Sequence, residues 1–200
     1  MPVFLSEIPI LFKNNILPLD VAIIQVSPPD QHGYCSLGTS IDVARSAVDT
    51  AKYVIAQVNP KMPRTLGDSM VHIRRIDKMV WHESELMTIN YGAKVSDEER
   101  TIGKYIAEMI DDKSTIQMGI GTIPDSVLKN LTNHKNLGIH TEMFSDGAIP
   151  LIKNGTINNS LKKKVKGYCV TSFLLGTKAL YDFADDNPII KSLAIDYVND

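Results

Sequence analysis

Two long apolar runs near the start of the chain constrain its fold more than any other feature. LDVAIIQVS (residues 19–27) and KYVIAQVN (residues 52–59) are both nearly continuous in apolar side chains. Such runs are typical of strands buried on both faces of a parallel sheet. The segment between them, SIDVARSAVDTA, has the pattern of a helix. Strand, helix and strand in this order predict a parallel α/β unit.

The alternation of strand-like and helix-like segments continues in the second half of the chain. Ser96 and Glu99 form the S-x-x-E pattern of a capping box, which predicts a helix over DEERTIGKYIAEMI. The stretch ESELMTINYGAK before it is typical of a connector, so we expect a domain boundary near residue 94. Further strands are expected at STIQMGIG (114–121), NLGIH (136–140), VKGYCVTSF (165–173) and IKSLAIDYV (190–198). Further helices are expected at PDSVLKNL, GAIPLIKNG and TKALYDFAD, with Pro124 opening the first of them.

Composition excludes several classes of function. The 200 residues carry a formal net charge of −2, which does not predict nucleic-acid or membrane binding through bulk charge. The one basic cluster, Lys162 to Lys164 with Lys166, is interpreted as a solvated face. The first residues, MPVFLSEIPILFKNN, do not have the pattern expected of a secretion signal, and no apolar run of the sequence reaches the length of a membrane span. Cys35 and Cys169 form no CxxC pair, which favours a reducing, cytoplasmic setting.

No metal is expected, because the five histidines lack the spacing of metal ligands. The stretch SPPDQHGYCSLG invites comparison with a hydrolytic triad through Ser27, Asp30, His32 and Ser36. No GxSxG elbow accompanies these residues, and a triad is defined in space rather than by spacing, so the comparison is weak. A buried thiol suits Cys35 better than a nucleophile.

The glycines of QMGIGTIPDSV form the first candidate site. Gly119 and Gly121 stand between an expected strand and the helix that Pro124 opens. A glycine-rich turn at a helix start can cradle a phosphate or supply N–H donors to an oxyanion. It can equally be a tight turn that needs positive φ. The residues alone leave both interpretations open, and the pattern is not a dinucleotide-binding fingerprint.

Glu142, in GIHTEMFSDG, is the second candidate. A carboxylate just past the carboxyl end of a strand lies where open α/β sheets place their ligands. The alternative is an ordinary acid beside a turn at Asp146-Gly147. By spacing alone, the turn interpretation is favoured.

Three segments together resemble the acetyl-CoA hydrolase/transferase family, and within it the 4-hydroxybutyrate (butyrate–acetate) CoA-transferase branch. They are PLDVAIIQVSPPDQHGYCSLGTSID, NPKMPRTLGDSMVHIRRID, and the pair QMGIGTIPDSVLKNL and LGIHTEMFSDG. The pairing of GIGxIP with GIHTEMFSDG is highly specific, and the similarity runs through essentially all 200 residues.

The resemblance implies roles for both candidates. Glu142 is expected to be the covalent nucleophile. The glycine loop is expected to bind coenzyme A and the thioester oxygen through Gly119, Ile120, Gly121, Thr122 and Ile123. The implied reaction moves CoA from an acyl-CoA to a short-chain carboxylate of the acetate, butyrate or 4-hydroxybutyrate type, with no metal or redox cofactor. An acetyl-CoA hydrolase and a non-catalytic CoA-binding fragment stay open as alternatives.

The resemblance also implies an α/β fold with open, mainly parallel sheets of CoA-transferase type in two domains. Residues 1–94 would form the C-terminal part of the first domain, and residues 95–200 the N-terminal part of the second. Members of the family are about twice this length, so we expect a fragment in which both domains are incomplete and a second glycine-rich loop is missing. A homodimer or higher oligomer is expected from the same resemblance.

Overall fold

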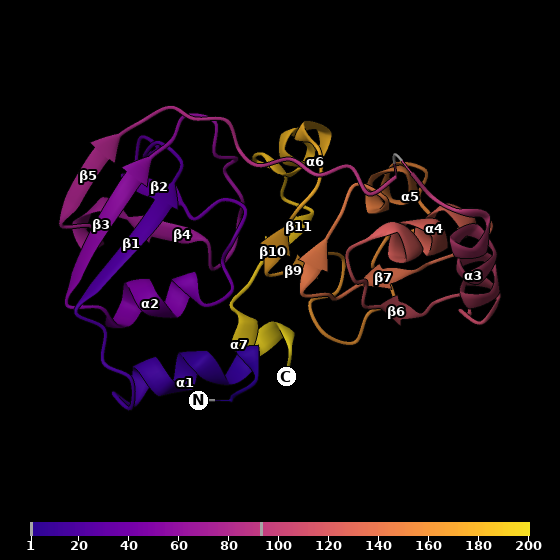
Figure 1. Ribbon diagram of the computed structural model, residues 1–200, viewed down its shortest axis with the longest axis horizontal. Helices are drawn as coiled ribbons and strands as arrows, with labels where there is room; N and C mark the ends of the chain where they lie inside the picture. The colour runs from indigo at the N-terminus through magenta and orange to yellow at the C-terminus, as the bar shows by residue number, and fades with distance from the viewer. Residues whose placement is uncertain (1, 93) are drawn as a thin grey trace.

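A three-stranded parallel sheet organises the first half of the chain in the computed structural model (Figure 1). The structure describes residues 2–92 and 94–200; Ala93, within the expected connector, lies outside the described residues. The sheet has the order β1-β3-β5, with both pairings parallel. The elements of this half are η1 (Leu5–Glu7), α1 (Ile8–Lys13), β1 (Val21–Val26), β2 (Tyr34–Ser36), α2 (Ala44–Thr50), β3 (Tyr53–Val58), β4 (Met70–His72), η2 (Ile73–Arg75) and β5 (Lys78–Trp81).

The expectation that β1 is buried on both faces is wrong for this structure. Its side chains alternate between buried and exposed, and Ile23 is 78 % exposed whereas Val26 is fully buried. The buried face packs with α2 in one hydrophobic cluster that includes Val48 and Val54. Ile23 and Val21 lie on the opposite face, which the described chain does not cover. A continuous apolar run therefore identified the strand correctly but not the number of its buried faces.

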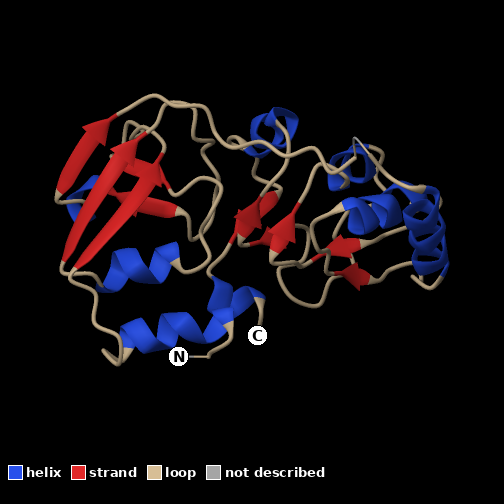
Figure 2. Ribbon diagram, in the orientation of Figure 1, coloured by secondary structure: helices blue, strands red, loops and turns tan. Residues whose placement is uncertain are grey.

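The second half is built from short parallel strand pairs and surrounding helices (Figure 2). The pairs are β6–β7, β8–β10 and β9–β11, and a parallel bridge between His140 and Val170 links the first pair to the last. The elements are α3 (Asp97–Glu108), β6 (Thr115–Ile116), α4 (Thr122–Asn130), β7 (Gly138–Ile139), β8 (Met143–Phe144), α5 (Ala148–Lys153), β9 (Cys169–Thr171), β10 (Phe173–Leu174), α6 (Lys178–Ala184), β11 (Ile190–Ser192) and α7 (Ile195–Val198).

The capping box at the start of α3 is confirmed. The backbone N–H of Glu99 donates to Ser96 Oγ at 3.2 Å, and Glu99 Oε2 accepts from the backbone N–H of Ser96 at 2.8 Å. These two bonds satisfy orphan donors at the helix start. The helix they fix packs closely on α4, where Gly103 lies against Ser126 with no room for a Cβ.

Several element boundaries differ from expectation, two of them by half or more of the expected strand. The strand expected over residues 114–121 is only β6, Thr115 and Ile116, and the rest is a loop leading into α4. The strand expected over residues 190–198 ends at Ser192 and is followed by the short helix α7. The break has a tertiary cause, because the backbone N–H of Ala194 donates to Asp68 Oδ2 at 3.0 Å in the other half of the chain.

Each half has its own hydrophobic cluster, one around β1 and β3 and one around α4, β7 and Phe144. Backbone bridges join the halves along β10 and β11. Gly67 forms a parallel bridge with Ser192, and Ser40 forms an antiparallel bridge with Phe173. In Figure 1, α7 lies next to α1 although the two helices come from opposite ends of the chain. The sheets are mainly parallel, as predicted, with the pair β2–β4 antiparallel. The division at residue 94 stays a prediction.

Candidate functional site

The strand pair β6–β7 delivers both candidate motifs to one place. Thr115 pairs with Gly138 and Ile116 with Ile139, so both strands end side by side. The glycine loop leaves the end of β6, and the segment carrying Glu142 leaves the end of β7. The site therefore lies at the carboxyl ends of two parallel strands, which is where open α/β sheets bind ligands.

Thr141 joins the two motifs directly. Its hydroxyl donates to the carbonyl oxygen of Met118 at 2.8 Å and accepts from the backbone N–H of Met118 at 3.0 Å. Thr141 is fully buried, so neither bond is exposed to water. A second link lies further on, where Ser145 Oγ donates to Asp125 Oδ1 at 3.0 Å. Thr141, directly before Glu142, is thus hydrogen-bonded to Met118, directly before Gly119.

The glycine loop owes its shape to Gly121. This residue is the N-cap of α4 with φ of 123°, a conformation that side-chain-bearing residues rarely adopt. A Cβ at Gly121 would meet only Pro124 at 3.9 Å, so backbone conformation rather than space requires the glycine. Helix α4 begins at Thr122, two residues before Pro124. The expectation that Pro124 opens the helix is therefore off by two positions.

The loop is open to solvent on one side. Gly119 and Ile120 are exposed, and within the described residues the backbone N–H groups of Gly119, Ile120 and Gly121 donate to no other group of the chain. The Thr122 hydroxyl donates to Glu99 of the α3 capping box, which holds the far end of the loop. An apolar cavity of about 340 Å³ borders the loop. Its lining includes Ile106, Ile116, Gly119, Ile123 and Pro124.

Glu142 is held by its backbone and left partly accessible at its side chain. Its carbonyl oxygen accepts from the Thr171 hydroxyl at 3.0 Å and from the backbone N–H groups of Ser172 and Phe173 at 3.1 and 2.9 Å. The side chain is half-buried, and Oε2 accepts from Asn199 Nδ2 at 2.6 Å. Sequence reasoning missed both sets of partners, because they lie far from Glu142 in the sequence and no local pattern marks them.

Residues around Glu142 have structural contacts of their own. Asp146 accepts from the backbone N–H of Thr177 at 2.8 Å and from its hydroxyl at 2.5 Å, which fixes the start of α6. His140 Nε2 lies 3.2 Å from the carbonyl oxygen of Val198. Burial, with a smaller contribution from Lys162, lowers the pKa of His140. Its ring lies 5.9 Å from that of Tyr197.

The basic cluster is not uniformly a solvated face, which corrects the interpretation of Lys162. This side chain is 5 % exposed, and its Nζ donates to the carbonyl oxygens of Ile139 and Tyr168, both at 2.6 Å. Burial lowers its pKa to about 8. Lys163 and Lys164 remain accessible and border, with His140, a cavity of about 570 Å³.

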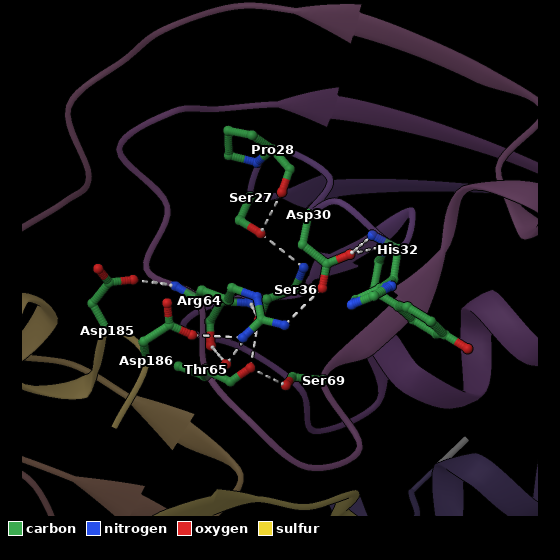
Figure 3. Close-up of polar contacts among 12 residues, drawn as sticks. Ser27, Pro28, Asp30, His32, Ser36, Arg64, Thr65, Ser69, Asp185 and Asp186 are labelled. Carbon is green, nitrogen blue, oxygen red and sulfur yellow. Dashed lines mark hydrogen bonds and ion pairs between the residues drawn. The ribbon is translucent and has the colours of Figure 1, made fainter. Parts of the chain in front are cut away.

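The residues that invited comparison with a hydrolytic triad form structural contacts instead (Figure 3). Ser27 Oγ donates to the carbonyl oxygen of Pro28 and accepts from the backbone N–H of Ser36. Asp30 Oδ1 accepts from the backbone N–H groups of His32 and Tyr34, each at 2.9 Å. The bond from Tyr34 and the Arg64 guanidinium outweigh desolvation and lower the pKa of this carboxyl. Neither serine hydroxyl is bonded to His32, whose ring instead lies 3.2 Å from Gln31 Nε2.

Arg64 occupies the centre of that network. Its Nη2 lies 2.8 Å from Asp30 Oδ2, and its Nη1 lies 2.5 Å from Asp186 Oδ1, so it joins the first half of the chain to the segment after α6. Its backbone N–H also donates to Asp185 Oδ1 at 2.7 Å.

Cys35, in β2, is fully buried, and burial raises the pKa of its thiol to about 11. A thiol held protonated in this way is a poor nucleophile.

Among residues 2–92 and 94–200, no three His, Cys, Asp or Glu side chains gather as candidate metal ligands. No helix in the described ranges is long and apolar enough to cross a membrane. The groups that the two motifs bring to the site are a carboxylate and backbone N–H donors.

Comparisons with known proteins show which proteins this chain resembles. Residues 1–90 match the family model of the acetyl-CoA hydrolase/transferase N-terminal domain. The chain is 51 % identical to the 4-hydroxybutyrate coenzyme A transferase of Clostridium kluyveri over 99 % of its own length and 46 % of the relative's. It is 47 % identical to the succinyl-CoA:acetate/propanoyl-CoA:succinate CoA transferase of Fasciola hepatica, of which it covers 41 %.

The crystal structure of 4-hydroxybutyrate CoA-transferase from Porphyromonas gingivalis superposes with a TM-score of 0.92 at 40 % identity. The superposition covers 100 % of this chain and 51 % of that one. The chain thus has the α/β fold of a CoA-transferase and spans about half the length of the curated relatives it matches. Residues 1–90 are thus similar to the N-terminal domain of the acetyl-CoA hydrolases/transferases, and over its whole length the chain is similar to CoA-transferases.

Proposed function

We propose that this chain carries the nucleophile of a CoA-transferase, which moves coenzyme A from an acyl-CoA to a free short-chain carboxylate. One observation carries the proposal: two hydrogen bonds between Thr141 and Met118 hold the segment of Glu142 next to the glycine loop. The similarity to CoA-transferases that act on 4-hydroxybutyrate and on succinyl-CoA with acetate supports the substrate class. Acetate, butyrate and 4-hydroxybutyrate are the carboxylates we propose.

Glu142 acts as a covalent nucleophile in this proposal. Its carboxylate attacks the acyl-CoA carbonyl, and the CoA thiolate leaves to give a mixed anhydride. The thiolate then attacks the glutamyl carbonyl, which forms a glutamyl-CoA thioester and releases the first carboxylate. A second carboxylate attacks this thioester, which gives a new mixed anhydride and free CoA thiolate. The thiolate then attacks the acyl carbonyl of that anhydride, which gives the new acyl-CoA and free Glu142. The two half-reactions make the kinetics ping-pong.

The glycine loop supplies electrostatic stabilisation. The N–H groups of Gly119, Ile120 and Gly121 donate to no other group within the described residues, and they lie at the start of α4. Donors of this kind aimed at a tetrahedral oxyanion contribute on the order of 3 kcal/mol each. Thr122 and Ile123 complete the proposed CoA loop. The apolar cavity beside Gly119 and Ile123 suits an alkyl part of the same substrate.

An acyl-CoA hydrolase that uses the same glutamate is the second candidate, because the matching domain family includes hydrolases as well as transferases. The two differ only in whether a carboxylate or water attacks the glutamyl-CoA thioester. We therefore expect the protein that carries this chain to consume acyl-CoA much faster when acetate is added, with a new acyl-CoA as product. A rate indifferent to added carboxylate would favour the hydrolase.

Substitution separates both enzymes from a non-catalytic CoA-binding fragment. Glu142→Ala abolishes transfer if the proposal holds, whereas Glu108→Gln, at an exposed glutamate in the last turn of α3, leaves it unchanged. A Glu142→Ala variant with full activity refutes the assignment. Binding of CoA by the wild type without any turnover favours the binding fragment.

A further inference from the structure

A cavity of about 500 Å³, here called the α3–α4 cavity, lies between α3 and α4. Figure 1 shows these helices side by side, and they pack so closely that a Cβ at Gly103 would lie 2.4 Å from Ser126 Oγ. Gly92 of the connector and Val95, directly after it, also line the cavity. Its volume is within the range of small-molecule sites in proteins, which is about 300–1,000 Å³.

Three cationic side chains line the α3–α4 cavity. Arg100 and Lys104 come from α3 and Lys129 comes from α4, and no carboxylate is among the described residues of the lining. Arg100 and Lys104 are four positions apart, so they lie on the same face of α3. Like charges at this spacing destabilise a helix. A bound anion would turn this repulsion into attraction.

The ion pairs that α3 itself supplies leave these two charges accessible. Arg100 Nη1 lies 3.1 Å from Asp97 Oδ1, and Lys104 Nζ lies 3.9 Å from Glu108 Oε1. All four side chains are at least 61 % exposed. Exposed pairs of this kind contribute little free energy, so they compete weakly with a ligand of higher charge.

Lys129 has no such ion pair. Within the described ranges its Nζ forms neither a salt bridge nor a hydrogen bond, and a Cβ at Gly92 would lie 3.1 Å from this nitrogen. Asp125, one turn earlier in α4, is buried and accepts at Oδ1 from Ser145 Oγ at 3.0 Å. The ammonium group of Lys129 is therefore available to an anion in the cavity.

Ser126 adds an unpartnered hydroxyl to the lining. The residue is 3 % exposed and borders the cavity. Its carbonyl oxygen accepts from Asn130 Nδ2 at 2.8 Å, but its hydroxyl forms no hydrogen bond with any other residue that the structure describes. Buried hydroxyls nearly always have a partner. This one points to a ligand with hydrogen-bond acceptors, independently of the three charges.

We propose that the α3–α4 cavity binds a phosphate group. Arg100, Lys104 and Lys129 neutralise its charge, and the Ser126 hydroxyl donates to one of its oxygens. A phosphate monoester carries a charge of about −1.5 to −2 near pH 7, so it matches three cations better than the single charge of a carboxylate does. Arginine also pairs with phosphate through two parallel N–H groups, and lysine supplies a point charge.

This site is separate from the glycine loop. Lys129 follows Thr122, the first residue of α4, by seven positions, which is about 10 Å along the helix axis. The phosphate has two possible sources, the phosphate groups of a coenzyme A molecule or a separate phosphorylated ligand. The inference goes beyond the proposed function, because it includes no covalent step and does not depend on the role of Glu142.

Charge reversal at Lys129 tests the site in the protein that carries this chain. Inorganic phosphate and adenosine 3′,5′-bisphosphate are titrated by calorimetry at constant ionic strength, set with chloride so that general screening does not change. Lys129→Glu is expected to weaken binding of at least one probe by about 10-fold or more. Lys135→Glu makes the same change of net charge at an exposed lysine outside the cavity, and should bind like the wild type.

Ser126→Ala separates ligand binding from effects on the fold. The hydroxyl has no partner within the described chain, so its removal should leave the melting temperature without phosphate unchanged. The affinity for the phosphate probe should nevertheless fall several-fold, because a donor to the ligand is lost.

Two measurements identify the source of the phosphate. If it belongs to coenzyme A, Lys129→Glu raises the KM for acyl-CoA by about 10-fold and leaves kcat and the KM for the carboxylate unchanged. If it belongs to a separate ligand, the KM for acyl-CoA is unchanged, and inorganic phosphate still binds the wild type in the presence of saturating CoA. Either result supports the site.

The site is overturned if the wild type binds neither probe, or if Lys129→Glu binds both as tightly as the wild type does. An equal loss of affinity in Lys129→Glu and Lys135→Glu also overturns it, because net charge rather than the cavity would then explain binding. These outcomes are independent of the proposed function, which a covalent adduct at Glu142 tests separately. A wild type that forms the adduct and binds neither probe keeps the function and loses this inference.

Discussion

Thr141 Oγ and the backbone of Met118 exchange two hydrogen bonds, at 2.8 and 3.0 Å, between the residues that directly precede Glu142 and Gly119. The same hydroxyl is 3.0 Å from the carbonyl oxygen of Met143. The nucleophile proposed here and the glycine loop are therefore positioned by one fully buried side chain.

Thr141→Val removes this hydroxyl while keeping the shape of the side chain. We expect a loss of about 1–3 kcal/mol in the free energy of unfolding, because the buried backbone N–H and carbonyl of Met118 lose their partner. Activity should fall as well, since the loop and Glu142 are no longer held together. Chemical denaturation and steady-state kinetics measure the two effects. Thr101→Val, at an exposed hydroxyl of α3, is the matched control, and equal behaviour of the two variants contradicts this role of Thr141.

Arg64 is expected to stabilise the docking of the two halves. Its guanidinium joins Asp30 to Asp186, and Arg64→Ala leaves both carboxylates without this partner. Because the arginine is partly accessible to solvent, we expect a modest loss of about 1–2 kcal/mol in the free energy of unfolding. Arg100→Ala, at an exposed pair with Asp97 within α3, should cost much less. Thermal melting of both variants checks this, and equal melting temperatures would count against the stabilising role of Arg64.

Lys162 gives the stability of the protein a specific pH dependence. Burial lowers its pKa from 10.5 to about 8, so the folded protein releases this proton near pH 8 while the unfolded chain keeps it until about pH 10.5. Between these values the unfolded state binds more protons, and stability rises with pH. The free energy of unfolding of the wild type should therefore rise, relative to that of Lys162→Met, by at most about 3 kcal/mol across that range. Urea denaturation of both proteins at several pH values measures the difference, and a constant difference would show that Lys162 does not titrate as described.

Local patterns predicted the features that local physics determines. The capping box of Ser96 and Glu99 was predicted because its partners lie within one helical turn. Parallel β1 and β3 follow from their apolar runs, and β7 places Glu142 just past a strand end as expected. Local patterns did not predict that Glu142 and the glycine loop belong to one site. That prediction came from the family resemblance.

Features that depend on distant contacts could not be predicted. The exposed face of β1 depends on what packs against the sheet, which no run of apolar residues reveals. Helix α7 replaces the end of an expected strand because Ala194 and Ile195 bond to residues 68 and 42. Lys162 was expected to be solvated with its neighbours, yet its ammonium is bound by two carbonyl oxygens. The contact of Asn199 with Glu142 spans 57 residues and leaves no trace in either local sequence.

Identification of the modified residue after exposure to acyl-CoA tests the central claim most directly. The protein that carries this chain is incubated with acetyl-CoA or butyryl-CoA, reduced with borohydride and digested, and the peptide containing Glu142 is examined by mass spectrometry. We expect Glu142 to be converted to the corresponding alcohol in the wild type, with no such change without acyl-CoA or in Glu142→Gln. An active enzyme whose Glu142 stays unmodified, with the reduction found at another residue or at none, would contradict the assignment of Glu142 as the nucleophile.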